Sequence, residues 1–462
     1  MNKFSWANVK QALSRKSVLS VIIIVALWNV FVSSNIIATK LQGEGPWRET
    51  FREIRDLNVH LQLRFYQLLT SWKPIKFAPS RVSLVYIDDD THWKWLYGDM
   101  PTSRGFLATL IRNASQPKTK AAAIALDVQL YAPERQGSDK EERDAANQAL
   151  LKAINDAADN GVPVILATGY YPEKDGRQVL IPGIFTNSQL PLKTSNGGCP
   201  PHPACAALGY INPPDDRRRI PLVEQLYTEN SGPIPFDSFA LAVTRVLEGP
   251  NRGITLDPLV AGAIKEGDRH PLFGSFIREY TSPEDILKLS DEQRRKYFPT
   301  ISIMDLYYGN PQAEGQCTDR ILLIGGHWRD IQGHGQLMDS HISPVGEISG
   351  LALHANYIES LLQHQFEPEV PVAFGVIIDV LTGLVAYICF GLATGIQKFV
   401  VLLLAFLTPP VVAYIFLVTL NLYLDFLLPL ELYFLHILYE TAKEYSELKH
   451  AVTPSGGHGL SQ

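Results

Sequence analysis

Apolar runs near both ends of the chain constrain it more than any other feature, because they bracket one large polar segment. Residues 17–39 carry no charged side chain and are long enough to cross the ~30 Å hydrocarbon core of a bilayer as a helix. Residues 372–394, 399–420 and 423–440 form three further apolar runs, separated by short polar or charged turns. We therefore predict four α-helical transmembrane spans around a polar domain at 41–368.

The charges that flank these runs predict which way the polar domain faces. Residues 1–16 carry four basic side chains and no acidic one, which keeps this segment in the cytoplasm by the positive-inside rule. Four crossings then place 41–368 outside the cytoplasm and return the tail, 443–462, to it. A cleaved signal peptide is the alternative interpretation of the first run, and it exports the domain equally.

Cysteine usage agrees with an oxidising compartment. Cys199 and Cys205 lie in the short proline-rich segment CPPHPAC, where a local disulfide is the simplest interpretation. A metal site that uses both thiols and His202 is the alternative, although three ligands do not complete a tetrahedral zinc shell. Cys317 would then be a free thiol.

Within 41–368, short apolar strands alternate with helical patterns. The predicted strands are 82–88, 121–128, 162–169 and 320–326, and the predicted helices are 102–114, 139–159 and 350–363. This alternation is typical of a mostly parallel sheet covered by helices on both faces, so the predicted fold class is α/β. The segment 170–300 interrupts the pattern with proline-rich loops and one helix at 238–247, and we interpret it as an insertion or lid.

Several segments, in order, resemble one protein family. VSLVYIDDD followed by MPTSRGFLATLI resembles a strand, an acidic turn and a Pro-x-x-Arg helix start. AAIALDVQLYAPE, LGYINPPDDRRRIPL, RILLIGG and DSHISPVGEISGLALHANYIESLL follow it. This series is similar to the CHASE2 family, bacterial extracytoplasmic sensory domains attached to membrane helices. The resemblance implies a sensor in the bacterial inner membrane whose large domain faces the periplasm.

Carboxylates follow two of the predicted strands. Asp88, Asp89 and Asp90 leave the first strand and Asp127 leaves the second, so in a parallel sheet they are expected at the same carboxyl edge. There they could hold a divalent cation or bind a cationic ligand, and the alternative is that they cap helices and end strands. The family-like segments add further candidate ligand-binding residues, namely Arg104, Asn212, Asp339 and His341.

Three histidines recur at seven-residue spacing in a glycine-containing loop. His327, His334 and His341 could bind zinc or another transition metal, or titrate near the pH of an exported compartment. Ordinary loop hydrogen bonding is the alternative. The GxGxxG, P-loop and GxSxG patterns are absent, so the sequence identifies no nucleotide, cofactor or serine nucleophile.

Polar residues inside the apolar runs indicate contacts other than lipid. Asp379, Glu431 and His436 are costly in hydrocarbon unless they are paired or face protein, so a partner-facing contact is expected. Basic residues are not concentrated in the polar domain, which gives no support to nucleic-acid binding.

The sequence therefore predicts a sensor that binds a ligand or a partner and is not itself an enzyme. CHASE2 sensors commonly continue into a cytoplasmic kinase or cyclase, whereas only 443–462 follow the last span here, so we expect signalling to a separate membrane or cytoplasmic protein. A structural docking subunit of an envelope complex is the first alternative. A metal-dependent hydrolase using Asp88 and Asp127 is the second. A homo-oligomer is also compatible with the sequence.

Overall fold

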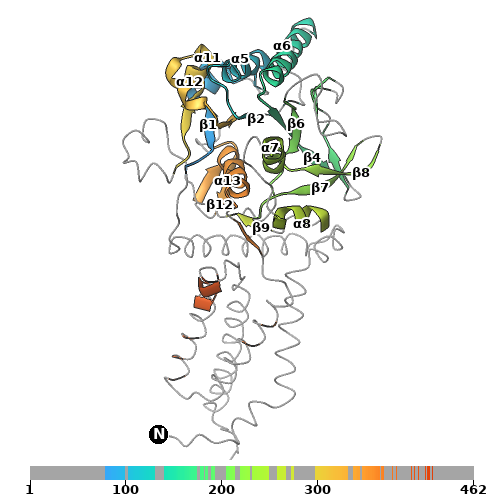
Figure 1. Ribbon diagram of the computed structural model, residues 1–462, viewed down its shortest axis with the longest axis vertical. Helices are drawn as coiled ribbons and strands as arrows, with labels where there is room; N and C mark the ends of the chain where they lie inside the picture. The colour runs from blue at the N-terminus through green and yellow to red at the C-terminus, as the bar shows by residue number, and fades with distance from the viewer. Residues whose placement is uncertain are drawn as a thin grey trace, which may run out of the picture. The chain divides into compact units, whose positions relative to one another are not determined.

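The computed structural model describes most residues between 79 and 368 (Figure 1). The described residues are 79–98, 102–128, 130, 140–173, 177–181, 183–185, 189–192, 204–213, 219–228, 231–248, 258–266, 272–274, 297–330, 337–343, 346–364, 366–368 and isolated positions between 377 and 419. The chain divides into two compact units, Thr70–Glu367 and a unit that combines Met1–Leu69 with Pro368–Gln462.

Across the described residues, we find no helix with both the length and the apolar character that a membrane crossing requires. The predicted spans 372–394 and 399–420 are described only at isolated positions. Four other predicted segments lie wholly outside the described residues: 1–16, 17–39, 423–440 and 443–462.

Six parallel strands form the central sheet of Thr70–Glu367. They are β1 (Val82–Ile87), β2 (Ala123–Asp127), β3 (Val164–Thr168), β6 (Ala207–Tyr210), β10 (Thr300–Ser302) and β11 (Ile321–Gly326). Their spatial order is β10-β1-β11-β2-β3-β6, and every pairing is parallel. The strands are mainly apolar because both faces of the sheet are covered. The prediction of an α/β fold with a mostly parallel sheet is confirmed.

Helices cover both faces of this sheet (Figure 1). One face carries α5 (Arg104–Ala114), α6 (Lys140–Asp159), α11 (Ile303–Tyr308) and α12 (Pro311–Cys317), and the other carries α7 (Phe239–Leu247) and α13 (Gly350–Leu362). Side chains alternate between the two faces of a strand, so Val85 and Ile87 of β1 enter the core beneath α5, whereas Leu84 and Tyr86 enter the core beneath α13.

The segment 170–300 is more than the predicted insertion or lid, because it supplies β6 of the central sheet. It also forms a second sheet in the order β4-β5-β7-β8, made of β4 (Tyr170–Pro172), β5 (Gln178–Leu180), β7 (Val223–Thr228) and β8 (Ser231–Asp237). The predicted helix at 238–247 is α7, and α8 (Pro258–Glu266) follows it. Two strand pairs complete the unit: β9 (Leu272–Gly274) with β14 (Phe366–Pro368), and β12 (Ser340–Ser343) with β13 (Gly346–Ser349).

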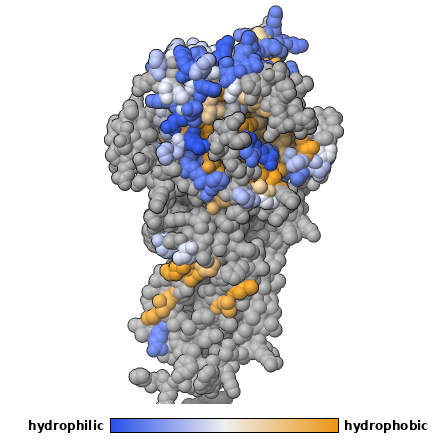
Figure 2. Space-filling model, viewed as in Figure 1, coloured by the Kyte–Doolittle hydropathy of each residue, from blue (hydrophilic) through white to orange (hydrophobic). Residues whose placement is uncertain are grey.

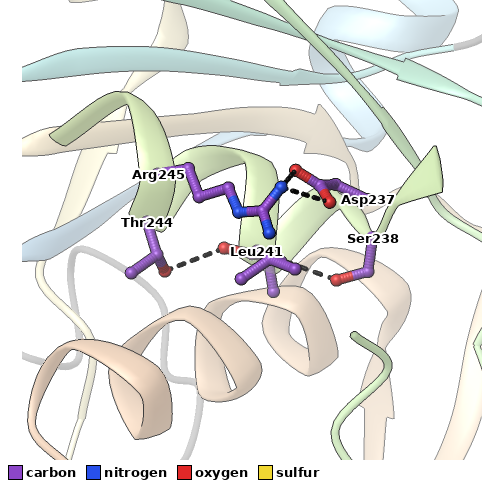
Figure 3. A network of polar contacts seen from close by, with 6 residues as sticks. Asp237, Ser238, Leu241, Thr244 and Arg245 are labelled. Carbon is purple, nitrogen blue, oxygen red and sulfur yellow. Dashed lines mark hydrogen bonds and ion pairs between the residues drawn. The ribbon is translucent and has the colours of Figure 1, made fainter. Parts of the chain in front are cut away.

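Polar side chains fix the first turn of α7, the helix that packs against α13. The Ser238 hydroxyl accepts a hydrogen bond from the Leu241 N–H at 3.1 Å and thereby caps the helix (Figure 3). Arg245 Nη1 contacts both carboxylate oxygens of Asp237 at 2.8 and 2.7 Å. Burial raises the pKa of Asp237, while the Arg245 guanidinium acts to lower it. The cap and the ion pair together hold α7 where β8 ends.

Candidate functional site

At the carboxyl ends of the neighbouring strands β1, β11 and β2, the chain leaves the sheet toward different faces. β1 and β2 lead to α5 and α6 on one face of the sheet, whereas β11, which lies between them, leads to α13 on the other face. Open parallel sheets bind ligands outside such a switch point. We call this region the carboxyl-edge site and define it by five residues from the strand ends and adjoining loops: Asp88, Asp89, Asp127, His327 and Asp339.

The loop after β1 uses its aspartates in three different ways. Asp88 Oδ1 accepts a hydrogen bond from the Thr91 N–H at 2.7 Å, which caps the helical turn that begins at Asp89 and continues into the π-helix η1 (Thr91–Trp95). Asp89 Oδ1 accepts a hydrogen bond from the Arg329 N–H at 2.5 Å. Asp90 forms an exposed ion pair with a lysine one helical turn later. Capping, the alternative interpretation of these residues, therefore applies to Asp88.

The loop after β11 is bound tightly to the loop after β1. The His327 N–H donates to the Ile87 carbonyl oxygen at 2.9 Å, and Trp93 Nε1 donates to the Arg329 carbonyl oxygen at 3.1 Å. The Trp328 ring stacks on His92 with 4.2 Å between ring centroids. These contacts continue the pairing of β1 and β11 beyond the end of the sheet.

His327 lies in the middle of this contact. Its ring centroid is 4.7 Å from that of Tyr86. Burial lowers the pKa of His327, and Arg329 lowers it further, while Asp89 and Asp88 act to raise it. The neutral form of the His327 side chain is therefore favoured, and an additional negative charge nearby would favour the protonated form.

Asp127 ends β2 on the opposite side of β11. It pairs with Gly325, where a side chain has no room, because an added Cβ would lie 2.6 Å from Leu351 Cδ1 and 2.9 Å from the Asp127 carbonyl oxygen. Burial raises the pKa of Asp127 to about 7, and the negative charge of Asp339 contributes to the rise. Asp127 can therefore gain or lose a proton near neutral pH.

Asp339 reaches the carboxyl-edge site from the segment before β12. Its Oδ1 lies 2.9 Å from His341 Nε2, and its side chain is 59 % exposed. Its carbonyl oxygen accepts the Gly350 N–H at 2.9 Å, and its carboxylate lies so close to Gly350 that a Cβ there would clash with it. The structure thus brings Asp339, with His341 beside it, within electrostatic reach of Asp127, which lies more than 200 residues earlier in the sequence.

Asp88 and Asp89 lie at the same edge of the sheet as Asp127, but on a strand that is not adjacent to β2. β11 separates β1 from β2, and two strand spacings amount to about 10 Å. The carboxyl-edge site therefore has two groups, one around Asp89 and His327 and the other around Asp127 and Asp339. Among the residues that the structure describes, no three His, Cys, Asp or Glu side chains lie close enough to hold a metal ion. The predicted metal ligand His334 lies outside those residues.

The remaining predicted site residues differ in their surroundings. Arg104 is the first residue of α5 and is 1 % exposed. The Asn212 side-chain amide bonds both the N–H and the carbonyl oxygen of Tyr170, at 3.0 and 3.1 Å, which is a structural role. Cys205 is disulfide-bonded, and Cys317 is a buried thiol that donates to the Ala313 carbonyl oxygen at 3.1 Å. Four predicted residues lie outside the described part of the chain: Cys199, Asp379, Glu431 and His436.

Sequence reasoning missed the residues that join the two loops, namely His92, Trp93, Trp328 and Arg329. Their contacts connect positions more than 230 residues apart, as for Asp89 with Arg329. No local pattern marks such a contact, although two tryptophans in loops after apolar strands are an unusual concentration of large side chains.

The model of the CHASE2 domain matches residues 49–395, well over half of the chain. The chain belongs to the CHASE2 family. CHASE2 domains are extracellular sensory domains, and the match extends beyond the predicted domain limit at 368. Neither the curated proteins nor the solved structures contain a significant match to this CHASE2 protein.

Proposed function

We propose that this CHASE2 protein is a membrane-anchored sensor whose domain 41–368 lies outside the cytoplasm. In this proposal, the domain responds to a ligand or condition at the carboxyl-edge site and signals through its apolar segments to a separate protein. One observation carries the proposal: groups able to bind or titrate lie on both sides of the end of β11, at the switch point of the sheet, in a domain of a sensory family.

The chemistry of the carboxyl-edge site favours a ligand with positive charge or hydrogen-bond donors. Asp127 and Asp339 repel each other when both are ionised, and a proton or a cationic group between them would relieve that repulsion. A ligand that also reaches Asp89 would span about 10 Å, the width of two strand spacings.

Exposed apolar side chains support the membrane anchor. The described positions in 372–394 and 399–420 include six large apolar residues that are about half exposed, and they appear as isolated orange patches in Figure 2: Ile377, Leu381, Val400, Leu404, Val411 and Ile415. In the proposal these residues face lipid, while Asp379, Glu431 and His436 face a partner protein.

Thermal unfolding of the detergent-solubilised full chain with a panel of organic amines and divalent cations tests the sensor. A ligand at 100 times its Kd should stabilise the fold by about 2.7 kcal/mol. Asp127→Asn should abolish the stabilisation, and Asp144→Asn on the exposed side of α6 is the matched control for a lost carboxylate. Stabilisation that survives Asp127→Asn contradicts this site, and a complete lack of stabilisation favours an inert docking domain.

The proposed topology has its own test. A cysteine placed at exposed Tyr171 should react with a membrane-impermeant maleimide in spheroplasts, whereas a cysteine at Ser455 should react only after lysis. Equal reaction at both positions in intact spheroplasts would refute the orientation.

A further inference from the structure

α13 runs from the carboxyl-edge site to the opposite end of the central sheet. Its thirteen residues span about 20 Å at 1.5 Å per residue, and it packs on both β1 and β11 (Figure 1). Almost every side chain of the helix is buried. A helix packed so completely moves as one body, so a displacement at one end reaches the other.

The first turn of α13 rests on the carboxyl-edge site. The Gly350 N–H donates to the Asp339 carbonyl oxygen at 2.9 Å, and the Asp339 carboxylate lies against the Gly350 backbone. Leu351 packs over Gly325, the residue paired with Asp127. A change in the spacing of Asp127 and Asp339 therefore acts directly on this turn.

The last turn of α13 holds the chain where it enters the sheet. Glu359 is 1 % exposed, and its Oε1 accepts hydrogen bonds from the N–H groups of Arg81 and Val82 at 2.7 and 3.0 Å. The Ser80 hydroxyl donates to the same oxygen, and Gln363 Nε2 donates to Oε2. Four uncharged donors thus converge on one buried carboxylate, which makes the contact strong and geometrically specific.

The contact of Glu359 with Ser80 joins two segments that lie near opposite ends of the unit. The chain enters the unit Thr70–Glu367 at Thr70 and leaves it at Glu367. Ser80 lies ten residues after the first end, and Glu359 lies eight residues before the second. The Glu359 carboxylate therefore fastens the incoming and outgoing segments of the unit to each other.

We propose that α13 couples the carboxyl-edge site to both chain connections of the domain, with Glu359 as the positioning residue that holds β1 to the end of the helix. The inference rests on the proposed function, because it assigns the path by which the sensed change leaves the domain. It adds that the incoming and outgoing segments move together and that one carboxylate sets their alignment.

Amide hydrogen exchange of the full chain at pH 8 tests the coupling, with fragmentation that resolves the amides of Arg81 and Val82. Asp127→Asn removes the repulsion of Asp339 at the far end of α13, and it should change the exchange rates of these two amides by about 5-fold or more, the lower range of allosteric coupling. In the background of Glu359→Ala, the same Asp127→Asn change should alter the two rates by less than about 2-fold.

The conservative variant separates positioning from simple stabilisation. Glu359→Gln keeps an oxygen that accepts from Arg81 and Val82, and the Gln363 amide can rotate to accept from the new side-chain amide, so the response to Asp127→Asn should return. Thr244→Val removes a buried hydrogen bond at 2.9 Å within α7 and is the control for lost stability, with the response intact.

Two results would overturn the coupling: no effect of Asp127→Asn on the two amides in the otherwise unchanged chain, or an effect that persists in Glu359→Ala. If Glu359→Ala does not fold, Ser80→Ala replaces it, since it removes one donor to the same oxygen and should reduce the response. The experiment uses no ligand, so its failure is distinguishable from a failed ligand search.

Discussion

Asp127→Asn should stabilise the protein increasingly as the pH rises. The pKa of Asp127 is raised from 3.8 to about 7 in the folded state, first by burial and then by Asp339. Between these two pH values the folded state binds a proton that the unfolded state has released, so the free energy of unfolding falls as the pH rises. It stops falling above about pH 7, where both states are ionised at this position.

The size of the effect follows from the width of that window. From pH 5 to pH 7 the free energy of unfolding falls by 1.36 kcal/mol for each of two pH units, or by about 3 kcal/mol. Asparagine has nearly the same shape and no charge, so the advantage of Asp127→Asn should grow by up to this amount between pH 5 and pH 8. For a domain of this size, the Tm of Asp127→Asn should rise by about 5 °C relative to the Tm of the unchanged chain between pH 5 and pH 8.

Thermal unfolding followed by tryptophan fluorescence at pH 5 and pH 8 measures this difference. Asp144→Asn, on the exposed side of α6, controls for the loss of one negative charge. Asp339→Asn should reproduce a smaller part of the effect, because Asp339 is the second cause of the raised pKa of Asp127. A Tm difference for Asp127→Asn that stays constant from pH 5 to pH 8 would refute the reasoning.

Three further variants test the close packing at Gly325, the cap of α7 and the burial of His327. Gly325→Ala should destabilise by about 1–3 kcal/mol in urea, because its Cβ would overlap Leu351, whereas Gly315→Ala, inside helix α12 with no atom within 4 Å, should stabilise by up to about 1 kcal/mol. Ser238→Ala should lower the urea midpoint by the equivalent of about 1 kcal/mol through loss of the α7 cap, and an unchanged midpoint would contradict that role. Burial lowers the pKa of His327, so the folded state resists its protonation, and His327→Gln should reduce the loss of stability between pH 7.5 and pH 5.5.

Hydrophobic pattern predicted those elements of the fold that are long or continuously apolar. The strand predicted at 82–88 is β1 at Val82–Ile87, and the helix predicted at 139–159 is α6 at Lys140–Asp159. β6 was not recognised as a strand, because ALGY has four residues and no β-branched side chain. Packing against neighbouring elements holds β6 in place. Gly209 lies so close to α7 that an added Cβ would be 2.5 Å from the Cα atom of Phe239. Tertiary packing overrides local propensity in this strand.

The sequence predicts at which edge of the sheet the candidate site lies, but not which of its residues are neighbours. Polar residues at the ends of parallel strands indicate the carboxyl edge, and Asp89 and Asp127 both lie there. The insertion of β11 between β1 and β2 depends on a strand almost 200 residues further along, so the separation of Asp89 from Asp127 could not be read from either segment. The seven-residue histidine spacing was uninformative for the same reason, since His327 is placed by β1 and His341 by its strand pairing in the β12–β13 hairpin.

The two groups of the carboxyl-edge site differ in what they can contribute to sensing. Asp88 and Asp89 each accept a backbone N–H through Oδ1, so a ligand there shares the carboxylate with an existing hydrogen bond. Asp127 is different, because at pH 8 its raised pKa makes the ionised form cost up to about 4 kcal/mol relative to an exposed carboxylate.

A cation that pairs with ionised Asp127 offsets part of that cost in the folded state. A sensor needs such a difference between its occupied and empty states, since a ligand shifts a conformational equilibrium only by its differential affinity for the two states. In the proposed coupling, the occupancy of Asp127 acts on α13 through Leu351 and Gly350.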